Sequence, residues 1–214
     1  MSSPDEEPAW KQRAIERSTK AATLRAAQRV QRFLDAAQDI MAEKGGTDFT
    51  VQEVVDRSGQ SLRSFYLQFD GKHELLLALF EDALGRSAGE IRAATETRTE
   101  PLEKLSVAVH MLFDSCRPNP SSTRPLFTDF ASGLLMTHPA EVKIAHLPLV
   151  GLLEELMKEA AAAGVLRPGV KPRRMAAMTM QSVMFIAQSV GSDDTRPITS
   201  DEVWEFCSRG FAGA

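Results

Sequence analysis

The chain has 214 residues, of which 43% are hydrophobic and 25% charged, a composition ordinary for one or two small globular domains. No apolar run is long enough to cross a bilayer, and the first ten residues lack a basic-then-apolar signal arrangement, so we expect a cytoplasmic protein with no membrane partner. The two cysteines, Cys116 and Cys207, stand far apart without metal-binding spacing, which favours a reducing compartment and predicts no metal.

The net charge of −4 is distributed unevenly along the chain. Residues 9–34 hold seven basic side chains and one acidic side chain, a net charge of +6, which leaves −10 on all other residues. Such a polarised molecule can present one end to a polyanion and keep the other end away from it. A solvated charged helix would show the same composition, so charge alone does not decide between the two.

Residues 1–22 are predicted to be disordered or to form a basic N-terminal arm. The first eight are acidic and contain proline, whereas residues 9–22 are polar and helix-compatible without a clear apolar face. We expect this arm to become helical on DNA and to reach the backbone or the minor groove, although a tail without a role is the alternative. The basic side chains expected to contact DNA are Lys11, Arg13, Arg17, Lys20 and Arg25.

The first regular element is predicted over residues 24–44, where apolar side chains recur at helical spacing from Val30 to Met41. Two consecutive glycines, Gly45 and Gly46, end it. Its apolar face should hold two short helices that follow. Together they form a three-helix bundle over residues 23–72.

Residues 50–69 carry the pattern of a helix-turn-helix. Thr50 followed by Glu53 is a capping box that starts a helix of about two turns, and Gly59 supplies the left-handed residue that ends it. Ser61 can cap a second short helix in which Phe65 points inward. The second helix of such a pair lies in the major groove of DNA.

The stretch SGQSLRSFYLQFDGKHELL resembles the recognition-helix signature of the TetR family of bacterial transcriptional regulators. The resemblance rests on Gly59, Ser61, the pair Phe65–Tyr66, Phe69 and Lys72. Three positions depart from the commonest form of the signature: Phe65 replaces a smaller aliphatic, Gln68 a ring or basic residue, and Asp70–Gly71 a Pro-Ser pair. The motif covers about 25 residues, and the C-terminal part fits the family only in architecture.

The helix-turn-helix assigns two kinds of DNA contact. Side chains on the second helix are expected to read bases, with an Arg–guanine contact the most informative, whereas those at helix ends are expected to bind phosphates and set register. The base-reading candidates are Gln60, Leu62, Arg63 and Ser64. The phosphate-binding candidates are Thr50, Ser61, Tyr66, Gln68 and Lys72.

A connecting helix over residues 73–97 is expected to join this bundle to a C-terminal domain over residues 98–214. Proline, glycine and serine clusters divide that domain into helices, and no alternating pattern predicts a strand. The fold is therefore predicted to be all-α, with about nine helices. Those of the C-terminal domain are expected at residues 101–116, 123–136, 139–163, 171–190 and 200–211.

Wide apolar helix faces in the C-terminal domain predict a small-molecule cavity, with a plain core as the alternative. Its candidate lining residues are Val109, Leu112, Phe113, Phe127, Phe130, Leu134, Leu153, Met157 and Met178. The family comparison implies that the last two helices pair with their copies in a homodimer, while packing within one subunit is the alternative. The candidate interface residues are Met180, Met184, Phe185, Val203, Trp204, Phe206 and Phe211.

These features predict a sequence-specific DNA-binding transcriptional regulator, a bacterial repressor released from a palindromic operator by a small, apolar or mixed effector. The chain has no Gly-rich phosphate loop, zinc-spaced Cys/His set or nucleophile elbow, so neither catalysis nor a cofactor is expected. Two alternatives stay open within binding functions, a helical adaptor without specific DNA readout and an activator without an effector. An enzyme that uses the C-terminal cavity is the third.

Overall fold

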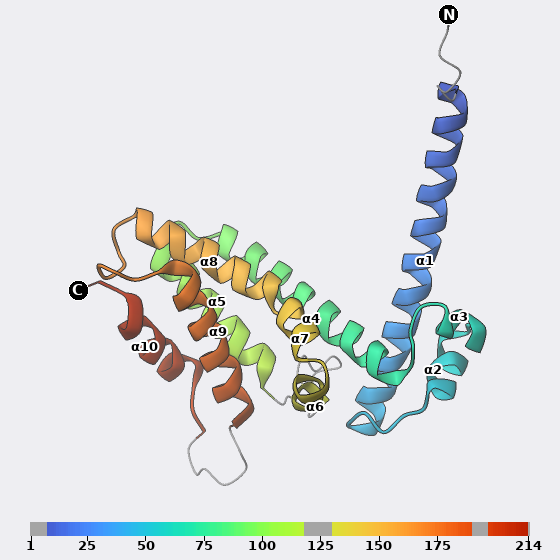
Figure 1. Ribbon diagram of the computed structural model, residues 1–214. Coiled ribbons are helices and arrows are strands. Elements are labelled where there is room, and N and C mark those ends of the chain that lie inside the picture. Colours follow the sequence, from blue (N-terminus) through green and yellow to red (C-terminus); the bar gives the residue numbers. More distant parts are fainter. Residues whose placement is uncertain (1–7, 118–129, 190–196, 214) are drawn as a thin grey trace, which may run out of the picture. The chain divides into compact units, whose positions relative to one another are not determined.

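Ten α-helices make up the part of the chain that the computed structural model describes, residues 8–117, 130–189 and 197–213 (Figure 1). Within these ranges the only β-structure is a single bridge between Leu166 and Ala212, which confirms the all-α prediction. The helices are α1 Ala9–Lys44, α2 Val51–Ser58, α3 Leu62–Tyr66, α4 Lys72–Glu96, α5 Pro101–Cys116, α6 Phe130–Thr137, α7 Pro139–Ala145, α8 Leu147–Ala162, α9 Pro172–Ser189 and α10 Ser200–Phe211.

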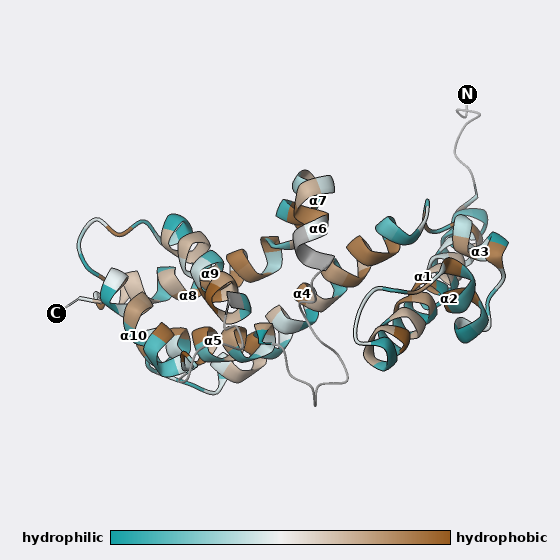
Figure 2. Ribbon diagram, turned by 90° about the horizontal axis from the view of Figure 1, so that it is seen from below, coloured by the Kyte–Doolittle hydropathy of each residue, from teal (hydrophilic) through white to brown (hydrophobic). Residues whose placement is uncertain are grey.

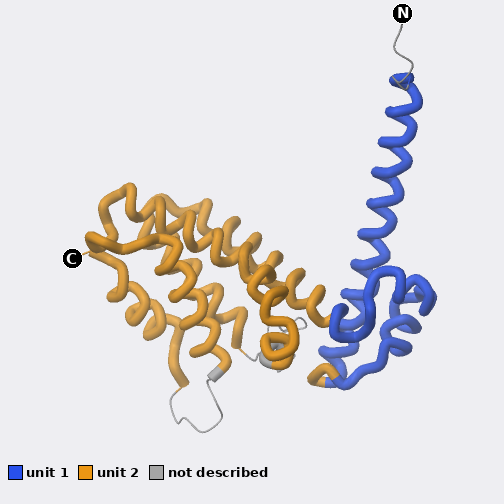
Figure 3. The backbone as a smooth tube through the Cα atoms, viewed as in Figure 1, with its two compact units in different colours: residues 1–44, 48–75 blue, residues 45–47, 76–214 orange. Residues whose placement is uncertain are grey.

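The chain divides into two compact units (Figure 3). The N-terminal unit comprises residues 1–44 and 48–75, and the C-terminal unit comprises residues 45–47 and 76–214. Helix α4 begins in the first unit and continues into the second. The predicted boundary at residue 72 therefore lies close to the division that the packing produces.

Aromatic rings form the core of the N-terminal unit. The ring of Phe33 in α1 meets the ring of Phe65 in α3 edge-on at 5.3 Å between centroids, and Phe69 lies 5.3 Å from Phe65. All three side chains are buried, together with Val54 and Val55 of α2. Edge-to-face ring pairs of this kind add specific geometry to the burial of apolar surface.

Helix α1 begins much earlier than predicted, at Ala9 instead of about residue 24. The segment before residue 24 contains alanine, lysine, arginine and glutamine and lacks glycine and proline after Pro8, so its intrinsic helix propensity is high. Its buried residues all lie in the C-terminal part, from Phe33 to Met41. The prediction underestimated the helix because it relied on an apolar face, which only the packed part needs.

The C-terminal unit is built around α5, α8 and α9. Buried side chains of α5 from Leu105 to Phe113 pack with those of α8 from Leu149 to Met157. The N-terminal half of α4 has a continuous apolar stretch, Leu75–Phe80, which Figure 2 shows between polar ends of the helix. The helices predicted at residues 101–116 and 200–211 are confirmed with identical bounds.

One predicted helix, at residues 139–163, is divided in the structure into α7 and α8. Pro148 stands in the first turn of α8 and has no N–H to donate to the preceding turn, so a continuous helix would lose a backbone hydrogen bond there. The junction residue His146 instead bonds through Nδ1 to the carbonyl of Val142 at 2.7 Å. This division accounts for ten helices where about nine were expected.

Backbone hydrogen bonds join residues 211–213 to the loop between α8 and α9. The N–H of Arg167 donates to the carbonyl of Phe211 at 2.9 Å, and the N–H of Gly213 donates to the carbonyl of Val165 at 2.8 Å. The Arg167 guanidinium also donates to the carbonyl of Gly210. Helix α10 is therefore held at its C-terminal end by backbone bonds and against α5 by its buried face.

An ion pair holds the other end of α10 to α5. His110 Nε2 lies 2.9 Å from a carboxylate oxygen of Asp201, and His110 Nδ1 lies 2.7 Å from the carbonyl of Ser106. Burial disfavours the charged ring, but these two hydrogen bonds outweigh it and raise the pKa of His110. Both ring nitrogens face acceptors, an arrangement that the doubly protonated imidazolium satisfies.

This pair predicts a pH-dependent loss of stability in Asp201→Asn. Because the folded-state pKa of His110 is raised, the pair contributes its full stability below the unfolded value of about 6.5 and loses it as the pH rises through the folded value. Thermal unfolding should therefore show a larger drop in Tm at pH 6 than at pH 8.5. Glu103→Gln, which disrupts the exposed pair with Arg98, is the control. Equal drops of Asp201→Asn at both pH values would contradict the assignment.

No helix in the described ranges is long and apolar enough to cross a membrane. Among the same residues there is no group of three or more His, Cys, Asp or Glu side chains that could hold a metal ion.

Candidate DNA interface and ligand cavity

The predicted capping box of α2 is present in full. Thr50 Oγ1 accepts a hydrogen bond from the N–H of Glu53 at 3.2 Å, and a Glu53 carboxylate oxygen accepts one from the N–H of Thr50 at 2.7 Å. Lys44 Nζ lies 2.7 Å from the other oxygen of Glu53, so hydrogen bonds from Lys44 and Thr50 lower the pKa of Glu53 to about 2. Gly59 ends the helix at φ 65°, in the left-handed region that favours glycine.

A second contact fixes α2 against the end of α1. The guanidinium of Arg57 donates to both carboxylate oxygens of Glu43 at 2.8 Å each. This parallel two-bond geometry orients the helix more than it stabilises it, because both side chains are exposed. Thus α2 is positioned at its start by the cap and at its end by Arg57.

Helix α3 is short and is anchored on one side only. Ser61 caps it by accepting a hydrogen bond from the N–H of Ser64 at 3.1 Å, as predicted. Phe65 is fully buried, while Leu62, Arg63 and Tyr66 are exposed. The helix therefore presents a side with an arginine, a tyrosine hydroxyl and an aliphatic side chain, which is the chemistry that reads base edges and phosphates.

The structure brings the base-reading candidates together at the start of α3. Leu62 and Arg63 are exposed, and Gln60 and Ser64 are partly exposed. Gln60 donates its backbone N–H to the carbonyl of Val55, so the turn before α3 has a defined backbone. All four remain candidates for contacts to bases.

The phosphate-binding candidates differ in how free their side chains are. The hydroxyl of Thr50 donates to Glu53 at 3.1 Å and also serves the cap, so its capacity for a phosphate is already used. Ser61 uses an oxygen lone pair for its cap, which leaves the hydroxyl hydrogen for another acceptor. Lys72 is the first residue of α4, and its Nζ lies 4.6 Å from the centroid of the Phe49 ring. Tyr66 is exposed and Gln68 partly exposed.

Leu67 is a candidate that the sequence reasoning missed. Its side chain is 72% exposed although it follows directly on the recognition helix. Phe65 and Phe69 are both buried, so helical geometry turns the residue midway between them outward. That spacing was visible in the sequence, and it makes Leu67 a candidate for apolar contact with a thymine methyl group.

The five arm candidates, by contrast, do not gather around α3. All of them lie on the N-terminal part of α1, and all are exposed. They are Lys11, Arg13, Arg17, Lys20 and Arg25.

The C-terminal unit contains a cavity of about 620 Å³ among α4, α6, α7, α8 and α9, which we term the α7–α9 cavity. Its wall is mostly apolar, with two cations, Lys143 and Arg173, and no acidic side chain among the described lining residues. His146 also lines it, and burial lowers the pKa of that ring, so the imidazole is neutral at pH 7. The lining residues are Phe80, Leu135, Pro139, Val142, Lys143, His146, Leu147, Val150, Arg173, Ala177, Met180, Gln181, Met184, Phe185 and Gln188.

The predicted lining residues lie elsewhere. Six are buried in the helix core and are not part of the cavity wall: Val109, Leu112, Phe113, Leu134, Leu153 and Met157. Met178 is exposed and lines a different hollow. Phe127 and the side chain of Phe130 lie outside the described residues. Apolar periodicity identified the inward faces of the helices. It did not identify where neighbouring helices leave a cavity between these faces.

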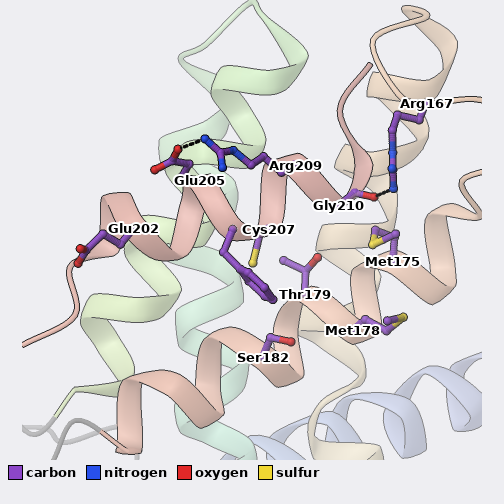
Figure 4. A pocket seen from close by; sticks show the side chains of 11 residues that line it. Arg167, Met175, Met178, Thr179, Ser182, Glu202, Glu205, Cys207, Arg209 and Gly210 are labelled. Atoms are coloured by element: carbon purple, nitrogen blue, oxygen red, sulfur yellow. Dashed lines mark hydrogen bonds and ion pairs between the residues drawn. The ribbon is translucent and has the colours of Figure 1, made fainter. Parts of the chain in front are cut away.

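That second hollow, the α9–α10 groove, has a volume of about 730 Å³ and lies between the outer faces of α9 and α10 (Figure 4). Met178 and Ser182 of α9 line one side, and Glu205, Phe206 and Arg209 of α10 line the other. Figure 4 shows Glu205 and Arg209 joined by an ion pair along α10.

The dimer candidates divide into two sets. Phe185 and Phe206 are 73% and 66% exposed, and Trp204 is partly exposed with its ring 5.9 Å from that of Phe211. These exposed side chains remain candidates for an interface with a second copy. The other four are buried inside the subunit: Met180, Met184, Val203 and Phe211.

Comparison with known proteins identifies the region that contains α2 and α3. A family described as bacterial regulatory proteins, tetR family, matches residues 33–79, which span the packed end of α1, all of α2 and α3, and the start of α4. The chain carries the DNA-binding domain of the tetR family. The resemblance predicted from residues 59–72 is thereby confirmed, and with it the prediction of a helix-turn-helix transcriptional regulator.

Several known proteins are similar to this chain over most of its length. The HTH-type transcriptional activator FasR of Mycolicibacterium smegmatis is 25% identical over 177 residues, which cover 81% of this chain and 76% of FasR. The structure of FadR from Bacillus subtilis in complex with stearoyl-CoA has a TM-score of 0.61 at 17% identity, with 84% of this chain and 98% of that one covered. The structure of AibR in complex with isovaleryl coenzyme A and operator DNA has a TM-score of 0.54 at 16% identity, covering 85% and 97%.

Proposed function

We propose that this chain acts in the cytoplasm as a dimeric transcriptional repressor that reads a palindromic DNA site and is released from it by an anionic amphiphile. The observation that carries the DNA-reading role is the exposed side of α3, which presents Arg63 and Tyr66 while Phe65 anchors the helix. Arginine reads guanine through two parallel hydrogen bonds, and a rigidly held helix is needed to aim it.

The dimer in this proposal uses the outer faces of α9 and α10. Met178 and Ser182 of α9 line the groove, and Phe206 lies across it on α10. The exposed Phe185 follows Ser182 at helical spacing beyond the groove. Two-fold pairing would cover these exposed side chains with the same surface of a second copy. It would also set two recognition helices on half-sites about 34–36 Å apart, which makes the operator a palindrome.

The α7–α9 cavity is the proposed effector site. Its apolar wall fits a hydrocarbon chain, and Lys143 and Arg173 supply positive charge without an acidic neighbour among the described lining residues. An acyl group joined to a phosphate-bearing carrier combines these two chemistries. Acyl thioesters of this kind, stearoyl-CoA and isovaleryl-CoA, are named as bound in the FadR and AibR structures.

Helix α4 provides a path between the cavity and the DNA. Phe80 lines the cavity, and the phosphate candidate Lys72 stands eight residues earlier on the same helix, about 12 Å along its axis. A ligand that favours one position of Phe80 would bias the start of α4. Such coupling is reciprocal. Bound DNA should therefore lower the affinity for the ligand by the same factor by which bound ligand lowers the affinity for DNA.

The double variant Lys143→Gln/Arg173→Gln should bind stearoyl-CoA at least about tenfold more weakly, because each charge-assisted hydrogen bond contributes about 1.5–3 kcal/mol. Its affinity for octadecanol, which shares only the chain, should stay unchanged. Isothermal titration of both ligands measures the difference. The control is Arg92→Gln/Lys158→Gln, which removes two exposed cations of the same unit that do not line the cavity. An equal loss in the control would contradict a charged effector site.

The proposed function is tested by selecting bound duplexes from a random pool with purified protein at a stated salt concentration. A recovered palindrome supports a dimeric DNA reader and supplies the operator. Salt-sensitive binding without a recovered motif would overturn the proposal in favour of a helical adaptor protein. Adding stearoyl-CoA to the recovered complex then tests release.

A second candidate, activation, is favoured by one observation: the relative FasR is named a transcriptional activator. The DNA interface would be the same, so binding alone does not separate the two functions. Transcription in vitro from a template with the selected site does. Fewer transcripts on adding the protein support repression, and more transcripts support activation.

A further inference from the structure

The N-terminal part of α1 is a helix whose side chains are exposed in the described part of the chain. Every side chain from Ala9 to Lys20 is exposed, and the first side chain of α1 classed as buried is Phe33. Figure 3 shows this part of α1 extending away from the other helices of the N-terminal unit. We term residues 9–28 the α1 rod. From Ala9 to Phe33 the helix axis extends about 36 Å.

The α1 rod is strongly basic. Five basic residues stand against the single acid Glu16, a net charge of +4 over twenty residues. Arg13 and Arg17 are one helical turn apart, and Lys20 and Trp10 continue the same side. Arg17 Nε donates to the carbonyl of Arg13 at 3.1 Å, which holds its side chain along the helix. A row of cations of this kind repels itself and is stabilised by a polyanion.

The apolar side chains of the rod do not suit another helix or a membrane. Trp10, Ile15 and Leu24 are exposed. Ile15 lies about 140° around the helix from Trp10, whereas Trp10 and Leu24 lie within about 40° of each other. Arg13, Arg17 and Lys20 stand between these two, so the apolar side chains form no continuous seam. A coiled coil needs a continuous seam, and a membrane-surface helix needs one apolar face. Charge complementarity therefore favours DNA as the partner.

We propose that the α1 rod is a second DNA-binding surface, which grips phosphates flanking the site read by α3 and adds affinity without adding sequence preference. This inference rests on the proposed DNA-reading function, because α3 belongs to the same compact unit and brings the duplex to it. A helix is about 10–12 Å wide and the minor groove only about 6 Å, so a helical rod lies against the backbone instead of entering that groove. Its reach matches about one turn of duplex.

The test compares two variants with equal charge change. In the rod variant, Lys11, Arg13, Arg17 and Lys20 are changed to glutamine, which retains helix propensity. In the control, Arg92, Arg98, Lys158 and Lys171, all exposed, are changed in the same way. Full-length proteins are titrated from low to high salt with two duplexes, one ending at the selected site and one extended by a helical turn on each side. Circular dichroism verifies that both variants keep their helices.

The rod variant should lose about 0.9 in the slope of log affinity against log salt for each phosphate contact removed, up to about 3.6 for the four contacts of each subunit and about 7 for the dimer. The wild-type protein should bind the extended duplex more tightly than the short one, and the rod variant should bind both equally. Glu16→Gln should strengthen binding to the extended duplex. An unchanged slope, an equal loss in the control, or a rod variant with altered base preference would each overturn the inference.

The same experiment separates this inference from the proposed function. If the wild-type protein recovers no motif, the proposed function fails. The salt slopes on a random duplex still decide whether the α1 rod binds phosphates. If a palindrome is recovered and the slopes of wild type and rod variant agree, only the rod inference fails.

Discussion

Replacing Phe65 by alanine should destabilise the N-terminal unit by about 3–5 kcal/mol. The side chain is fully buried and lies 5.3 Å from both Phe33 and Phe69, measured between ring centroids. Alanine would leave a cavity lined by the rings of Phe33 in α1 and Phe69 between α3 and α4. Rigid rings cannot easily move to fill such a cavity. Because a small domain has only about 5–15 kcal/mol of stability in all, this is a large part of the total, and DNA binding should fall in step with the folded fraction.

Urea unfolding followed by circular dichroism measures this loss. The matched control is Leu67→Ala, two residues further along, where the side chain is 72% exposed and its removal should change the free energy of unfolding by less than about 0.5 kcal/mol. If Leu67→Ala weakens DNA binding without lowering stability, the apolar contact proposed for it is supported. Equal destabilisation by the two substitutions would contradict the assignment of Phe65 as the anchor of α3.

The second large effect is expected from Arg63→Ala, which should relax base preference at one position of each half-site. A two-bond contact from arginine to guanine accounts for about 1–3 kcal/mol of discrimination, or roughly 5- to 150-fold between the preferred base and the others. Arg63 is exposed on α3, so the protein should stay folded. Binding to single-base variants of the selected operator measures the effect.

Lys72→Ala provides the contrast, because a phosphate contact sets register without reading sequence. It should lower the affinity for all duplexes by a similar factor and lower the salt slope by about 0.9 for each subunit, or about 1.8 for the dimer. Lys72 also lies over the ring of Phe49, so its unfolding curve is recorded alongside to separate lost packing from lost charge. A change of base preference in Lys72→Ala, or uniform weakening in Arg63→Ala, would reverse the roles given to the two residues.

The helix-turn-helix was predictable in detail because local rules specify it. The capping box at Thr50, the left-handed Gly59 and the cap at Ser61 each depend on neighbours within a few residues, and all three are present. The burial of Phe65 follows from helical spacing within the same segment. Residues 33–79, which match the tetR family, include this stretch.

The C-terminal unit was predictable only as a set of helices. Turn residues placed α5 and α10 correctly, but cavity-lining residues such as Lys143 and Arg173 were not among the candidates. A cavity exists where faces of several helices fail to meet, which depends on how those helices pack. No periodicity within one helix contains that information.

By itself the sequence determined the all-α class, the ends of the helices that carry clear capping or turn residues, such as α2, α5 and α10, and the charge of the N-terminal segment, because capping, propensity and composition act over a few residues. Only the tertiary structure decided which apolar side chains of α9 and α10 stay exposed, Phe185 and Phe206 but not Met180 or Phe211. It also decided that the cations of the α1 rod lie on an exposed helix. Burial is a relation between elements distant in the chain, and it is settled only when those elements come together.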